Sequence, residues 1–195
     1  MYFWQRYKIL ILQNNKPIII FLIKFFVSYF LLLGLYSFYL NQTQHKETGL
    51  FSCAPVTENV AKQASGIMNF LGFNTKIEQH PTELSMKVLV NDKYVARVIE
   101  GCNSVSVIIL FLAFIIAFKG SLKNTVLFGI IGSVLIYIVN LIRIGILSVG
   151  LYKYPEQEKL LHDLIFPAIV YGMVLILWII WVNKFSDYNK GDVSE

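Results

Sequence analysis

Four long apolar runs constrain what this chain can fold into more than any other feature of its sequence. A helix rises about 1.5 Å per residue, so roughly 20 apolar residues cross the hydrocarbon core of a bilayer. Hydrophobic residues make up 56% of the 195-residue chain and charged residues only 15%, a balance that excludes a soluble domain of this length. We therefore expect an all-α polytopic membrane protein with four transmembrane helices, at residues 18–40, 105–118, 125–150 and 164–182.

Three of these runs carry features that affect how they span. The run 105–118 is short, and reaches spanning length only if Cys102, Asn103 and Ser104 form its first helical turn. The first run contains Lys24 close enough to its start for the ammonium group to reach the interface. Trp178 and Trp181 near the end of the last run are expected to form an interfacial aromatic belt.

A polar insert of about 60 residues separates the first two runs and has its own pattern. Thr57 is expected to cap a helix with an apolar stripe that ends at Gly72. Residues 75–79, 85–90 and 94–99 read as strands, and Asn91-Asp92 reads as the turn between the last two. The expected organisation is an N-terminus and first helix at 1–40, a small α+β insert at 41–101, a three-helix membrane core at 102–183 and a tail at 184–195.

The charges of the short connecting segments predict the orientation in the membrane. The N-terminal segment carries Arg6, Lys8 and Lys16 without an acid, and the loop 119–124 carries two lysines without an acid. Both are expected in the cytoplasm, because basic residues favour the cytoplasmic side. The loop 151–163 balances basic with acidic residues, so it and the insert are expected on the outer side, with the C-terminus inside.

This topology brings three chemically active side chains to one membrane face. Cys102 lies at the outer start of the second helix, Arg143 about two turns below the outer end of the third, and His162 at the outer start of the fourth. A charge inside a membrane span costs several kcal/mol and marks a functional candidate. The alternative for Arg143 is a cation that extends to the interface, and Cys102 alone could be an apolar filler.

The chemistry of the three side chains fits nucleophilic catalysis. The positive end of a helix beginning at Cys102 and a nearby guanidinium favour a thiolate, and the guanidinium can also bind an oxyanion. His162 can accept the thiol proton and return it to a leaving amine. Supporting roles are expected for Gly101, which permits a sharp turn and close substrate approach, for Asn140, which could hold a substrate backbone, and for Asp163, which could orient His162.

Other classes of site lack a sequence signal. His45 and His80 are isolated, so no metal and no cofactor are expected, and the net charge of +5 is assigned to membrane orientation, not to nucleic-acid binding. Cys53 is also expected on the outer side, so a disulfide between Cys53 and Cys102, which would abolish the nucleophile, is left open.

These motifs resemble those of the exosortase/archaeosortase family of membrane transpeptidases, in particular the short F-type bacterial exosortases. The resemblance rests on Gly101-Cys102-Asn103-Ser104, on Asn140 to Ile144 and on His162-Asp163, within residues 100–183. It implies Cys102 as nucleophile with Arg143 and His162 as catalytic partners. Many family members have Ser-Gly after the cysteine, where this chain has Asn103-Ser104, so both residues become candidates for substrate contact.

The resemblance also implies a substrate and a location. The substrate would be an exported protein with a C-terminal motif, a transmembrane helix and a basic end, cleaved through a thioester and transferred to an amine or lipid acceptor. The enzyme would lie in the bacterial inner membrane with its active site at the outer face. The alternative is a non-catalytic membrane scaffold that binds or assembles a partner through its insert.

Overall fold

The computed structural model describes residues 16–47, 50–118, 120–160 and 165–185. Three of its helices are long and apolar enough to cross a membrane, so the chain is an integral, multi-pass membrane protein. They are α2 (Lys16–Thr43), α5 (Leu122–Lys153) and α7 (Phe166–Ile180), which continues as the π-helical turn η4 (Trp181–Phe185).

The second expected span, residues 105–118, stays shorter than a membrane crossing needs. Helix α4 (Val105–Ala117) has 13 residues, which corresponds to a length of about 20 Å. Cys102 ends a separate 3-10 turn, η1 (Glu100–Cys102), and Ser104 has a left-handed φ of 65°. The prediction that residues 102–104 form the first turn of α4 is wrong, because a left-handed residue cannot continue a right-handed helix.

Close packing joins α4 to α5 and to α7. A Cβ added at Gly132 of α5 would lie 2.3 Å from Cζ of Phe111, so the glycine is what allows the phenyl ring to pack against α5. The Trp178 ring stacks on Phe114 at 4.2 Å between centroids. Trp181 is fully buried, so its assignment to an interfacial belt is wrong. Its indole fills the space beside Gly120, where a Cβ would lie 3.3 Å from the ring.

The insert is a helix on a three-stranded antiparallel sheet, ordered β3-β4-β5. The strands β3 (Thr75–Gln79) and β4 (Ser85–Val90) have the predicted bounds, and β5 (Lys93–Ile99) begins one residue early. Asn91 and Asp92 have φ of 51° and 62°, as a tight hairpin turn requires. The helix α3 (Pro55–Phe70) begins two residues before Thr57, because proline is well suited to the first helical position. Therefore Thr57 is not its cap.

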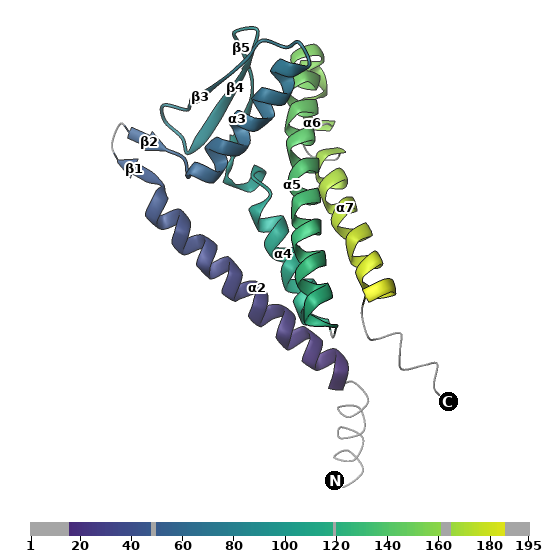
Figure 1. Ribbon diagram of the computed structural model, residues 1–195. Coiled ribbons are helices and arrows are strands. Elements are labelled where there is room, and N and C mark those ends of the chain that lie inside the picture. The colour runs from purple at the N-terminus through teal and green to yellow at the C-terminus, as the bar shows by residue number, and fades with distance from the viewer. Residues whose placement is uncertain (1–15, 48–49, 119, 161–164, 186–195) are drawn as a thin grey trace, which may run out of the picture.

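A second hairpin, formed by β1 (His45–Glu47) and β2 (Leu50–Ser52), has no counterpart in the sequence prediction. It connects α2 to α3 (Figure 1). Its strands have only three residues each, too few for an alternating pattern to be recognised.

The core of the insert extends onto the membrane helix α5. Val60, Ala64 and Met68 of α3 are buried against residues of the sheet, and Leu141 and Ile144 of α5 belong to the same apolar cluster. The insert is therefore built on the upper half of α5 (Figure 1). This packing fixes the sheet, and the turn η1 that follows it, relative to α5.

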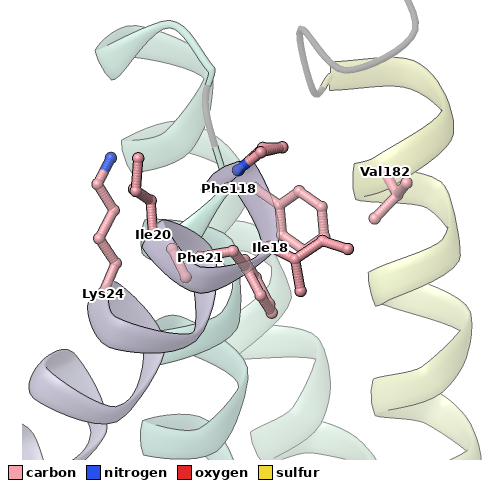
Figure 2. Close-up of a pocket in the computed structure, with 8 residues that line it drawn as sticks. Ile18, Ile20, Phe21, Lys24, Phe118 and Val182 are labelled. Atoms are coloured by element: carbon pink, nitrogen blue, oxygen red, sulfur yellow. The ribbon is translucent and has the colours of Figure 1, made fainter. Parts of the chain in front are cut away.

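The opposite end of the bundle contains an apolar cavity of about 520 Å³ between the start of α2, the end of α4 and η4. Val182 faces Phe118 there, and Ile18 and Phe21 line the α2 side (Figure 2). Among the lining residues that the structure describes, only Lys24 is charged. The cavity lies at the opposite end of α4 from Cys102, and apart from Lys24 its described lining residues are apolar.

Candidate functional site

Cys102 lies where the sheet of the insert joins the membrane helices. Strand β5 ends at Ile99, η1 follows directly, and the Cys102 side chain is half-buried beside the cluster shared by the insert and α5. Gly101 is exposed, and a Cβ at this position would meet nothing within 4 Å. The residue with a left-handed backbone is Ser104 and not Gly101, so the expected sharp turn lies three residues later.

The left-handed backbone falls at Ser104, the position at which the resemblance stated in the sequence analysis leads us to expect glycine. Glycine adopts positive φ without a steric penalty, whereas serine is strained there. In this chain the Ser104 hydroxyl donates a hydrogen bond to the Asn103 carbonyl at 2.6 Å. Serine at this left-handed position is therefore more strained than glycine would be. The buried Ser104 side chain bonds within the protein.

Asn140 links Cys102 to Arg143. The Asn140 Nδ2 donates to the Cys102 carbonyl oxygen at 2.7 Å, and an Arg143 terminal nitrogen donates to Asn140 Oδ1 at 3.2 Å. Asn140 is fully buried, and its amide engages the backbone of the protein itself. The structure thus places the cysteine, the asparagine and the arginine in one hydrogen-bonded chain across two elements.

Arg143 retains donor capacity beyond this bond. Its Nε is buried and has no hydrogen-bond partner among the described residues. A buried guanidinium N–H without a partner is costly.

Asn103 holds the other side of the cysteine turn. Its Nδ2 lies 2.7 Å from the Tyr36 hydroxyl, 3.0 Å from Thr57 Oγ1 and 3.1 Å from Glu100 Oε2. Its Oδ1 accepts from the Val105 N–H at 3.0 Å. Asn103 is fully buried, and its side chain bonds within the protein.

Three residues of this site, Tyr36, Thr57 and Glu100, had no predicted role there. Tyr36 comes from α2 and Thr57 from α3, and nothing local in the sequence relates either residue to Cys102. Glu100 offered one signal, because it is an acidic residue at the end of an apolar strand and two positions before the cysteine.

Cys53 lies in the same apolar cluster that Cys102 borders, and both thiols are free in the structure. The Cys53 side chain is 4% exposed. Burial raises the pKa of its thiol, and the negative charges of Glu100 and Glu58 raise it further, against an opposing effect of Gln79. Cys53 is therefore poorly suited to act as a thiolate nucleophile.

His162 and Asp163 lie outside the described residues, between Leu160 of the short helix α6 (Glu158–Leu160) and Ile165. Their predicted roles therefore stay predictions. Within the described ranges, no group of three His, Cys, Asp or Glu side chains is placed to hold a metal ion.

Comparison with known protein families identifies the family of this chain. A family model for transmembrane exosortases (EpsH) matches residues 9–182. Neither a curated protein nor a solved structure matches the chain significantly. The matched segment covers most of the 195 residues and contains Cys102, Asn140, Arg143 and His162. The chain therefore belongs to the transmembrane exosortase family.

Proposed function

We propose that this protein is a membrane-embedded cysteine transpeptidase that cleaves C-terminal sorting signals of exported proteins at the outer face of the bacterial inner membrane. The observation that carries the proposal is the hydrogen-bonded chain from Cys102 through Asn140 to Arg143. It links the backbone carbonyl of the candidate nucleophile to a cation whose buried Nε has no partner among the described residues. Family membership supports a protein substrate with a sorting signal.

The positions of Asn140 and Arg143 along α5 support a site at a membrane face. At a rise of about 1.5 Å per residue, Asn140 lies about 27 Å and Arg143 about 31 Å from Leu122. The hydrocarbon core of a bilayer is about 30 Å thick. If Leu122 lies at the inner boundary, as the basic loop beside it favours, the site lies at the outer boundary. There a polar cleavage motif that precedes a substrate's transmembrane helix can reach Cys102.

The proposed reaction has two steps. His162 takes the proton of the Cys102 thiol, and the sulfur attacks the scissile carbonyl while Arg143 donates hydrogen bonds to the resulting oxyanion. The C–N bond breaks, and His162 returns its proton to the leaving amine. An acceptor amine or lipid hydroxyl then attacks the thioester, loses its proton to His162 and displaces the Cys102 sulfur, which regains the proton.

The test is to trap the intermediate. Membranes that contain the full-length protein are quenched in acid, and Cys102 is examined by mass spectrometry for an attached exported-protein fragment that hydroxylamine releases. Cys102→Ala should abolish the adduct and cause an uncleaved precursor to accumulate, and Cys102→Ser should also be inactive, because a serine hydroxyl is far less acidic than a thiol. Normal processing in cells that carry only Cys102→Ala would exclude the proposal.

One observation favours the second candidate, a non-catalytic scaffold. At the C-terminal end of α3, Phe70 is 90% exposed and Leu71 is 66% exposed, and exposed apolar side chains of this size are common at protein interfaces. A scaffold would keep its cellular function in Cys102→Ala and lose it in the double variant Phe70→Ser/Leu71→Ser. If the protein is a transpeptidase, Cys102→Ala should instead lose its cellular function.

A further inference from the structure

A closed ring of hydrogen bonds lies beneath the cysteine turn and joins three separate parts of the chain. Tyr36 comes from the first transmembrane helix, Thr57 from α3, and Glu100 and Asn103 flank Cys102. The Tyr36 hydroxyl lies 3.4 Å and Thr57 Oγ1 2.5 Å from Glu100 Oε2. Asn103 closes the ring by bonding to both hydroxyls.

The number of available protons fixes the direction in which the two hydroxyls of this ring donate. An ionised carboxylate only accepts hydrogen bonds, so each hydroxyl uses its single proton on Glu100. Both hydroxyls then accept from Asn103 Nδ2, which has two protons and also lies 3.1 Å from Glu100 Oε2. This leaves Asn103 Oδ1 to accept from the Val105 N–H, as observed. The orientation of the Asn103 amide is therefore determined by residues of α2 and α3.

The ring is also tied to the start of α3. Glu100 Oε1 accepts from the Ala54 N–H at 3.3 Å, and Ala54 is the residue that precedes the helix. The positive end of the helix dipole favours an anion at that position. No lysine or arginine forms an ion pair with Glu100 in the described part of the chain, so neutral donors alone hold its charge.

This ring borders the one non-glycine residue of the site with a strained backbone. Ser104 has a φ of 65°, and the Asn103 side chain bonds on one side to the ring and on the other to the first N–H of α4. Strained backbone persists where the surroundings determine it, and it is frequent at functional sites. Asn140 holds the same turn from the α5 side through the Cys102 carbonyl.

We propose that the ring of Tyr36, Thr57, Glu100 and Asn103 positions the Cys102 thiol, so that the first transmembrane helix is a working part of the catalytic site and not only an anchor. This inference rests on the proposed function, since it assigns positioning residues to that reaction. Tyr36 is its most specific component, because it carries the ring across to α2, which otherwise packs mainly on α4.

The test uses Cys102 alkylation by iodoacetamide, which requires no substrate, in the full-length protein with Cys53→Ala as background. Tyr36→Phe removes only the ring hydroxyl, and Tyr39→Phe is the matched control on the same helix. Thr57→Val breaks the ring and Thr57→Ser preserves its hydroxyl. In Tyr36→Phe and Thr57→Val, we expect iodoacetamide to alkylate Cys102 at least about threefold faster than in the parent, because the half-buried thiol is no longer held in place. Tyr39→Phe and Thr57→Ser should match the parent.

Precursor processing is measured by pulse–chase in the same variants, per folded molecule, with the precursor defined as the protein that accumulates in Cys102→Ala cells. Processing should fall about tenfold in Tyr36→Phe and Thr57→Val at an unchanged melting temperature. The inference is overturned if both variants stay within twofold of the parent in alkylation and processing, or if the losses only follow a loss of folded protein. Undiminished processing in Cys102→Ala would instead overturn the proposed function itself.

Discussion

At the scale of single residues, Arg143 separates a catalytic role from an architectural one. A cation that only extends to the interface is replaced well by lysine, which has a similar apolar stem. The Arg143 guanidinium bonds Asn140 through one terminal nitrogen, and its Nε is a second donor that points in a different direction. Lysine lacks this planar arrangement of donors.

We therefore expect Arg143→Lys to accumulate normally in the membrane and to process precursor at least about 100-fold more slowly, the typical effect of losing one oxyanion donor. The measurement is the rate of precursor processing divided by the amount of folded protein. Turnover close to that of the parent would exclude the electrostatic role of Arg143.

Ser104 tests the strained turn after the cysteine. Ser104→Gly removes a left-handed strain of about 1–2 kcal/mol per residue, partly offset by the greater freedom of glycine in the unfolded chain. We expect its melting temperature to equal or exceed that of the parent, and its processing to be retained. Ser104→Val should be clearly less stable, because a β-branched residue tolerates positive φ poorly. If valine were tolerated as well as glycine, the backbone at this position would not be left-handed in solution.

The reactivity of Cys53 should depend on pH in a way that reflects its burial. Because burial raises the pKa of Cys53, its thiol stays protonated where an ordinary cysteine begins to ionise. Alkylation of Cys53 in the native protein should therefore rise only at a more alkaline pH than that of a free cysteine. The stability linked to this proton is present below the ordinary cysteine pKa, and it is lost as the pH rises through the higher, folded-state pKa. Peptide mapping after timed iodoacetamide labelling at several pH values measures this, and rapid labelling of Cys53 at neutral pH would contradict it.

At the scale of elements, the contact between α4 and α5 depends on Gly132. A methyl group there would overlap the rigid Phe111 ring, and overpacking of this kind costs about 1–3 kcal/mol. Gly132→Ala should lower the melting temperature of the detergent-solubilised protein. Gly172→Ala in α7, where nothing lies within 4 Å of the new Cβ, is the matched control and should be neutral. Phe111→Leu should partly restore the stability of Gly132→Ala, and equal melting temperatures for the two alanine variants would refute this packing.

At the scale of the whole molecule, the arrangement of the helices predicts which segments share a membrane side. The start of α2 and the turn between α4 and α5 lie at one end, and the insert lies at the other (Figure 1). Single cysteines placed in the insert at position 92 should react with a membrane-impermeant maleimide in intact cells, and a cysteine at position 121 should react only after permeabilisation. External labelling at position 121 would reverse the orientation and remove Cys102 from the outer face.

The amino-acid sequence by itself determined the elements whose cause is local. A long apolar run becomes a membrane helix because each backbone bond is satisfied within the helix, and this holds for α2, α5 and α7. The strands β3 and β4 and the turn at Asn91-Asp92 followed from residue type alone. The placement of Asn140 and Arg143 near Cys102 followed from the order of helices and the expected depth of each residue.

Only the tertiary structure decided where α4 begins, where Trp181 lies and what Asn103 and Asn140 bond. Each depends on partners far away in the chain, as Asn103 does on Tyr36 and Thr57. Trp181 carries an interfacial composition signal, yet the space beside Gly120 that buries it exists only once α4, α5 and α7 are packed. Local sequence patterns indicate which residues favour a helix, a strand or a turn. A buried polar group, in contrast, takes its hydrogen-bond partner from whichever segments the fold brings together.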